Sequence, residues 1–245
     1  RSVSPPIVMR HKPIKNKLFV QNRKRLAELM APKSLAVLNA NDVLPTNADG
    51  SLPMQPNADL FYLSGIEQEE SVLLLYPVAA EEKHREILFL RQPSEHLQIW
   101  EGYKHSKADA QKISGIKNVQ WLSEFPGIFR SLMLEAESAY LNSNEHKRAT
   151  VKVETRDDRF IRDCRHDFPL HNFHRLALLL HELRVVKAEP ELELLKEAVD
   201  ITAKGFRRTL RFVKPGVTEY EVEAEWAREF IRRRGKFAYT PIVAA

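Results

Sequence analysis

Five short apolar segments in the first 150 residues place the strongest constraint on the fold of this chain. Each is four to seven residues long, rich in Leu, Val, Ile or aromatic residues, and bounded by Pro, Asn, Gly or charged residues. The segments are Ser34–Ala40, Ser71–Tyr76, Glu86–Arg91, Val119–Leu122 and Ser138–Asn142. Short apolar runs between turn-forming residues are typical of strands in a buried sheet. We therefore expect a mostly buried β-sheet.

Helical patterns lie between some of these segments. Residues 17–30 carry apolar side chains at helical spacing among basic ones, and Pro32 follows. Ser106 is placed to cap a second helix that ends near Gly115, and residues 124–136 repeat apolar side chains at the spacing of a third. Strands alternating with helices over residues 17–150 predict an α/β layered domain.

The composition changes at about residue 150. Residues 151–175 collect aspartates, histidines and Cys164 with little periodicity, so we interpret them as a polar connection between two domains. His171 and His174 could share a face of a helix and bind one metal ion, but no known metal-ligand spacing surrounds them. We expect no metal site here.

Three helices are predicted after this connection, over residues 171–183, 190–213 and 218–234. Pro190 suits a first helical turn, the pair Pro215-Gly216 ends the second helix, and Thr218 with Glu221 forms a capping-box pattern for the third. The last segment, Tyr239–Ala245, reads as a strand without a partner nearby in the sequence. We therefore expect the second domain to be incomplete.

Composition excludes several classes of protein. With 8 glycines and neither GxxxxGK[ST] nor GxGxxG, the chain has no nucleotide-binding loop of those types. Its single cysteine, Cys164, cannot form an intramolecular disulfide. No apolar stretch approaches the ~20 residues of a membrane span, and no signal peptide is visible. We expect no membrane association and a cytoplasmic location.

The net charge of +5 is concentrated at the start of the sequence. Nine of the 38 basic residues lie among the first 33 positions, where Glu28 is the one acid. Residues 1–15 also carry prolines and lack periodicity, so we interpret them as an extended basic arm. Because the rest of the chain is slightly acidic, we expect no nucleic-acid partner. Salt-dependent binding that requires this arm would support the opposite hypothesis.

Two motifs combine residues that are unusual for a plain core. Asn57–Gly65 (NADLFYLSG) places turn-forming polar residues before aromatic ones and ends in a glycine, and Ile99–Lys104 (IWEGYK) places Trp100 beside a glycine in a loop. The order of motifs along the chain is more specific than either motif. It runs through Asn57–Gly65, the apolar strand, Phe89-Leu90-Arg91, Ile99–Gly102, His181–Lys187, Glu191–Ala198 and Lys214–Gly216.

This ordered set resembles the Xaa-Pro aminopeptidases (aminopeptidase P) over about residues 16–245. The resemblance implies a creatinase/aminopeptidase P N-terminal domain, a mixed sheet with flanking helices, over residues 16–170. It further implies the start of an α+β pita-bread metallopeptidase domain, truncated, over residues 171–245. The chain departs from the family pattern at Lys104, where the family commonly has arginine.

The resemblance implies a metallo-aminopeptidase that removes the first residue from peptides with proline second. In the family, two divalent ions, usually manganese, are held by two aspartates, a histidine and two glutamates of the pita-bread domain. Those ligands come later than the strand at Tyr239–Ala245. The resemblance therefore assigns no catalytic residue and no metal ligand to this sequence, and we expect the stretch alone to be inactive.

The resemblance also implies substrate contacts and partners. Trp100 matches a loop tryptophan that approaches a neighbouring subunit's active site, and Tyr239 is a candidate for the wall of the substrate cleft. Proline-containing peptides and a homo-oligomer, a dimer or a tetramer, are the expected partners. Two alternatives stay open: a prolidase, which acts on dipeptides, and a non-catalytic creatinase-like binding or assembly domain.

Overall fold

The computed structural model describes residues 13–94, 99, 101–148 and 152–244 of the chain. They divide into two compact units, one of Ile14–Val186 and one that contains residues 187–244. Because β6 and α7, introduced below, belong to the first unit, its end at Val186 comes later than the domain boundary that we expected at residue 170. Each unit is described by itself.

The first unit is built on a six-stranded mixed sheet in the order β4-β3-β2-β1-β5-β6. Its strands are β1 Ser34–Asn39, β2 Val72–Leu75, β3 Glu86–Leu90, β4 Asn118–Trp121, β5 Ser138–Leu141 and β6 Asn172–Arg175. β2 is antiparallel to both of its neighbours, and all other neighbouring pairs are parallel. All five predicted strands are confirmed, and so is the mixed α/β architecture.

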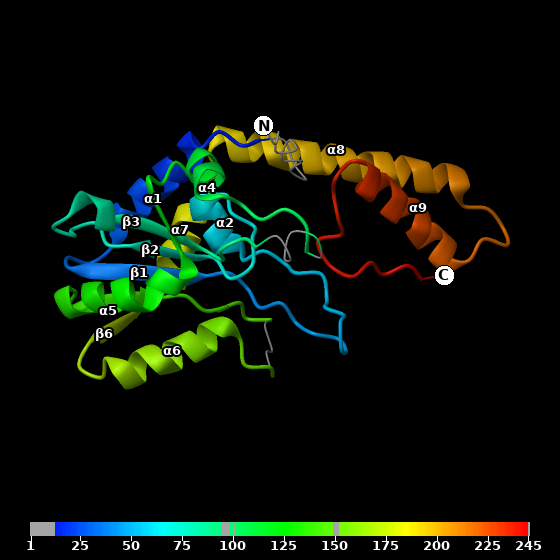
Figure 1. Cartoon of the computed structure of the whole chain (residues 1–245). Helices are drawn as coiled ribbons and strands as arrows, with labels where there is room; N and C mark the ends of the chain where they lie inside the picture. The colour runs from blue at the N-terminus through cyan, green and yellow to red at the C-terminus, as the bar shows by residue number, and fades with distance from the viewer. Residues whose placement is uncertain (1–12, 95–98, 100, 149–151, 245) are drawn as a thin grey trace, which may run out of the picture. The chain divides into compact units, whose positions relative to one another are not determined.

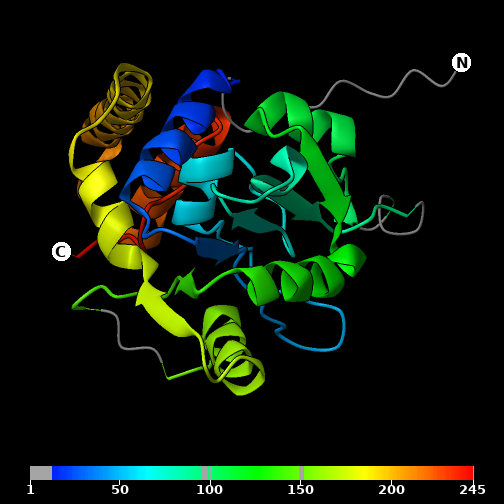
Figure 2. The same ribbon diagram turned by 90° about the vertical axis from the view of Figure 1, so that its left-hand side faces the viewer.

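Helices cover both faces of this sheet (Figure 1). One face carries α1 Lys17–Leu29, α2 Ala58–Ser64, α4 Lys107–Ser114 and α7 Leu176–Val185, and the other carries α5 Phe125–Glu135 and α6 Arg156–Asp167. The view in Figure 2 separates the same two helical layers, with blue α1 on one side of the strands and green α5 on the other. Two short 3₁₀ turns, η1 Glu82–His84 and η2 Leu122–Glu124, lie in connections.

Side-chain alternation along the strands explains why both faces need helices. In β1, Ala36 and Leu38 contribute to the core under α1, α2 and α7, whereas Leu35 and Val37 contribute to the core under α5 and α6. All four side chains are at most 1% exposed. Successive residues of a strand point to opposite faces, so an uninterrupted apolar run is buried on both.

Two predictions between residues 150 and 183 were wrong. The expected polar connection contains α6, which a capping box between Thr155 and Asp158 begins and whose Cys164 packs in the core. The helix expected from residue 171 begins at Leu176, because Asn172–Arg175 pairs with β5 as the edge strand β6. Pairing with a partner strand overrides the local pattern.

The second unit contains two helices, α8 Glu189–Phe212 and α9 Glu219–Arg232, close to the bounds expected from the sequence. Gly216, at φ +92°, lies in the turn between them, and Thr218 donates its backbone N–H to Glu221 at 2.8 Å, which caps α9. A Cβ on Gly205 would lie 2.9 Å from the Trp226 ring, so this glycine permits close packing of the two helices.

The strand expected at Tyr239–Ala245 is not formed by its described residues, 239–244. Within the described residues of this unit, no strand lies beside them to accept their backbone hydrogen bonds. An unpaired extended segment gains none of the ladder that defines a strand.

Candidate functional site at the carboxyl ends of β1 and β5

The main cavity of the sheet unit lies where β1 and β5 end. These neighbouring strands are parallel, so the segments that follow them emerge at the same edge of the sheet. The cavity measures about 720 Å³ and is lined by residues after both strands, by the loop before α2, by the start of α6 and by His181 and Arg184 of α7. Crevices beyond the carboxyl ends of strands are the usual ligand sites of α/β sheets.

The motif Asn57–Gly65 forms α2 at the wall of this cavity. The Asn57 side chain accepts hydrogen bonds from the backbone N–H groups of Asp59 and Leu60, both at 3.0 Å, and caps the helix. Gly65 ends the helix at φ +71°, where a Cβ would lie 2.4 Å from the Phe19 ring. The polar and glycine positions of the motif therefore set the start and end of one short helix.

Asp59 joins this motif to the end of α7. Its carboxylate lies 2.5 Å from the Arg184 guanidinium and accepts a hydrogen bond from the Asn142 amide at 3.1 Å. Tyr62 makes two further contacts with α7. Its ring lies 5.5 Å from the Arg184 guanidinium carbon, and its hydroxyl donates a hydrogen bond to the Leu183 carbonyl at 3.4 Å. Asp59 and Arg184 come from two motifs that carried the family resemblance, and the structure brings them together.

Asp157 is a cavity residue that our sequence analysis did not single out as a site. Its carboxylate accepts a hydrogen bond from the Asn39 amide at 2.9 Å, at the last residue of β1. Burial raises the pKa of Asp157 to about 6, although the Asn39 hydrogen bond acts in the opposite direction. A carboxyl group with this pKa exchanges its proton near neutral pH, which suits acid–base chemistry or a pH response.

The neighbouring Asp42 fixes the first turn of α6 to the loop after β1. Its carboxylate accepts from the backbone N–H of Arg156 at 2.7 Å and pairs with Arg159 at 2.6 Å. The pattern Thr155–Asp158 was the signal that could have predicted the helix and hence the position of Asp157.

Two described residues that follow Trp100 in the sequence, Glu101 and Lys104, belong to an ion-pair cluster. Lys104 is 8% exposed, and its amine lies 2.5 Å from Glu69 and 3.2 Å from Glu101. The Arg91 guanidinium lies 3.1 Å from the same Glu101 carboxylate. Trp100 itself falls outside the described residues. These pairs hold Glu101 and Lys104 of the motif against the loop before β2 and the residue after β3.

Tyr239, the second predicted substrate contact, lies in the second unit with its side chain 79% exposed. His171 and His174 have structural roles: the His171 ring nitrogen contacts the Met133 carbonyl at 2.7 Å, and His174 packs on Tyr140 at 5.0 Å. Burial raises the pKa of the Cys164 thiol to about 12, which leaves it unreactive.

The residues described by the structure do not fit a metal centre. No group of three or more His, Cys, Asp or Glu side chains among them is arranged to hold a metal ion. Within the same residues, no helix is long and apolar enough to cross a membrane.

The sequence matches two protein-family profiles. The profile "Aminopeptidase P, N-terminal domain" matches residues 19–141, half of the chain, and the profile "Metallopeptidase family M24" matches residues 193–245. The chain belongs to the aminopeptidase P family. Its expected resemblance is therefore confirmed.

Individual relatives agree with this membership. The Xaa-Pro aminopeptidase of Escherichia coli is 26% identical, over 93% of this chain and 52% of its own length, and that of Haemophilus influenzae is 24% identical, over 92% and 50%. A structure assigned to aminopeptidase P from Bacillus anthracis matches with a TM-score of 0.80 and 27% identity, over 89% of this chain and 52% of its own. The chain spans about half the length of the curated relatives it matches.

Proposed function

We propose that this chain supplies the N-terminal domain and part of the M24 domain of an Xaa-Pro aminopeptidase. Such an enzyme removes the first residue from peptides whose second residue is proline. The observation that carries the proposal is the presence of both family profiles, in order, in one chain. The names of the curated relatives favour this activity over that of a prolidase.

The metallopeptidase family implies divalent metal ions. The described residues do not provide a site for them, so no step of the reaction is assigned to this chain. The proposal places two ions, manganese by preference, in the part of the M24 domain that corresponds to the unmatched half of the relatives. The 245-residue chain is accordingly expected to be inactive by itself.

The role of the sheet unit in this proposal is to shape the substrate cleft and make subunit contacts. Its ion-pair cluster at Glu69, Glu101 and Lys104 fixes described residues close to Trp100 in the sequence, and we assign Trp100 to stacking on a prolyl ring. Tyr239 is the second proposed substrate contact. A homo-oligomer and a cytoplasmic location complete the proposal, although one plant relative carries "mitochondrial" in its name.

A chimera tests the proposal. Residues 14–186 would replace the matching N-terminal domain of the E. coli Xaa-Pro aminopeptidase, and release of arginine from Arg-Pro-Pro would be measured with manganese. We expect activity that requires proline in the second position. A folded chimera without activity, or with equal activity on Arg-Ala-Pro, would contradict the proposal.

The Trp100 assignment has its own matched control in the chimera. Replacing Trp100 with Ala removes a stacking interaction of about 1 kcal/mol, so KM should rise about fivefold with kcat nearly constant. Ile99→Ala truncates the neighbouring side chain, which is 77% exposed, and should leave KM unchanged. Equal effects of the two variants would refute a specific role for Trp100.

A further inference from the structure

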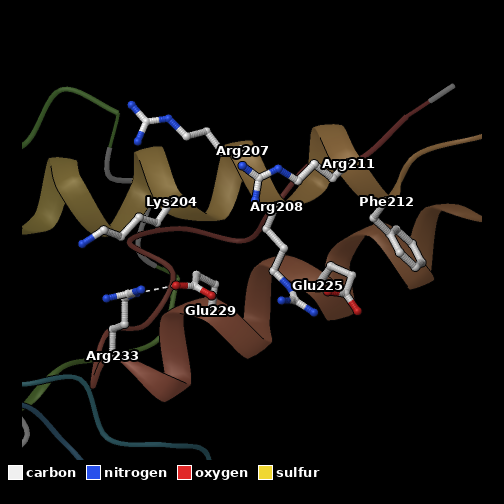
Figure 3. Close-up of a pocket in the computed structure, with 8 residues that line it drawn as sticks. All are labelled: Lys204, Arg207, Arg208, Arg211, Phe212, Glu225, Glu229 and Arg233. Atoms are coloured by element: carbon white, nitrogen blue, oxygen red, sulfur yellow. Dashed lines mark hydrogen bonds and ion pairs between the residues drawn. The ribbon is translucent and has the colours of Figure 1, made fainter.

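A basic groove between α8 and α9 lies outside everything assigned above. It is a cavity of about 520 Å³ with five cationic side chains at its wall: Lys204, Arg207, Arg208 and Arg211 from α8, and Arg233 just after α9 (Figure 3). Two carboxylates, Glu225 and Glu229, also line it. Cations therefore outnumber anions in the groove.

The carboxylates of the groove are already engaged. Glu225 pairs with Arg208, and Glu229 pairs with Arg233, which is the dashed contact in Figure 3. Lys204 pairs at 2.5 Å with Asp200, one turn earlier on α8. Among the residues that the structure describes, neither Arg207 nor Arg211 lies within 4 Å of a carboxylate oxygen. Two exposed guanidinium groups are thus available to an external anion.

The positions of these two arginines favour a ligand with more than one anionic group. Arg207 and Arg211 are four residues apart on α8, so they share a face and are separated by a rise of about 6 Å. Lys204 is on the same face, one turn before Arg207. A guanidinium group binds phosphate oxygens in a bidentate manner, and its charge does not depend on pH in the physiological range.

The helix dipole does not explain the whole cluster. Cations in the last turn of a helix are stabilised by the carbonyl groups there, and this accounts for Arg211. Lys204 and Arg207 precede the last turn of α8 and gain little from its dipole, whereas Arg233 lies at the carboxyl end of α9 and gains from the dipole of that helix. Asp200, Glu225 and Glu229 already balance three of the five cations, so the unfavourable repulsion that remains is the one between Arg207 and Arg211.

The groove also remains open if the apolar side of α8 becomes covered. That side carries Leu195, Val199, Phe206 and Leu210, all at least 50% exposed. At about 100° per residue, Lys204, Arg208 and Arg211 lie about 130° or more around the helix axis from the centre of this stripe, and Arg207 lies about 90° from it. A partner surface packed on the stripe would leave the groove accessible.

We propose that the groove between α8 and α9 binds a ligand with two or three linked phosphate groups, through Arg207 and Arg211. The other cations of the groove raise the local positive potential, and Glu225 and Glu229 fix the orientation of Arg208 and Arg233. The inference does not depend on the peptidase activity.

Isothermal titration of the 245-residue chain with tripolyphosphate tests this site. We expect binding in about 50 mM salt that weakens steeply at 200 mM salt, and a loss of at least tenfold in affinity in the double variant R207Q/R211Q. Glutamine is a good helix former, so circular dichroism should show an unchanged helix content.

Matched controls decide between this site and unspecific charge effects. Arg228→Gln removes an exposed arginine of α9 that does not line the groove, and it should leave binding unchanged. An equal loss in R228Q, or no binding of tripolyphosphate at all, would overturn the proposal. Citrate offers three carboxylates instead of phosphates, and equally tight binding of citrate would overturn the assignment of a phosphate ligand.

Discussion

The two units of this chain bury their apolar side chains to very different degrees. In the sheet unit, the strands and the helices on both faces supply two cores in which most side chains are less than 5% exposed. In the helical unit, Phe230 is the one buried hydrophobic residue among those described, and the stripe of α8 is at least half exposed from Leu195 to Leu210. Caps, ion pairs and the contact between α8 and α9 hold the helical unit.

This contrast teaches that the same chain combines two sources of stability. Burial of apolar area dominates in the sheet unit, whereas local helix signals and a small aromatic cluster of Phe206, Trp226, Phe230 and Phe237 dominate in the helical one. The same kind of substitution should therefore change the free energy of unfolding by different amounts in the two units.

The largest difference is expected for truncated leucines. Leu74→Ala empties a site in β2 that is 0% exposed and should lower the free energy of unfolding by about 2–5 kcal/mol. Leu195→Ala on α8 removes a side chain that is 50% exposed, so we expect less than about 1 kcal/mol. Urea unfolding followed by circular dichroism measures both. Similar values would show that the stripe of α8 is as well packed as the sheet.

Two glycines with positive φ provide the next comparison. Gly65→Ala adds left-handed strain and a Cβ 2.4 Å from the Phe19 ring, for a loss of about 2–4 kcal/mol. Gly216→Ala adds strain alone, because no atom lies within 4 Å of the new Cβ, and should cost about 1 kcal/mol. Thermal unfolding of the two variants gives the difference, and a greater loss in Gly216→Ala would contradict the packing argument.

The smallest expected effect is the change of stability with pH. Its sign is opposite in the two units. Because the pKa of Asp157 is raised to about 6, its stabilisation is complete below the unfolded pKa near 4 and is lost as pH rises through 6. Asp157→Asn should therefore stabilise the sheet unit at pH 7 by about 2 kcal/mol or less. Unfolding measured between pH 5 and 8 checks this, and a profile unchanged by the variant would refute it.

Glu221 provides the opposite case in the helical unit. Hydrogen bonds from Thr218 hold the pKa of Glu221 below its usual range, so its stabilisation is present above the unfolded pKa and is lost as pH falls through the folded value. Glu221→Gln should leave stability below pH 4 nearly unchanged and lower it at pH 7.

The sequence predicts the parts of the fold that local patterns specify. Continuous apolar runs predicted the five strands β1 to β5, and Ser106 with Gly115 predicted the bounds of α4. α6 was missed although Phe160, Cys164 and Phe168 repeat every four residues, because the many charged residues between them obscured the pattern. β6 carries no comparable signal, since its four residues become a strand through pairing with β5.

The candidate site was predictable only in part. The motif Asn57–Gly65 drew attention to one wall of the cavity, but Asp59 meets Arg184 across 125 positions of sequence, a distance that no local pattern reports. Asp157 could be identified as a cavity residue only with the knowledge that α6 exists and that its first turn lies beside the end of β1.

The edge position of β6 matters for anyone who wishes to produce the sheet unit separately. A truncation at residue 170, the boundary that the resemblance implies, would remove β6 and α7 and leave the side of β5 that faces away from β1 without a partner strand. Exposed edges of this kind recruit further strands and promote aggregation. A boundary after Val186 keeps the native edge, and its polar residues Asn172 and Arg175 then protect the sheet in solution.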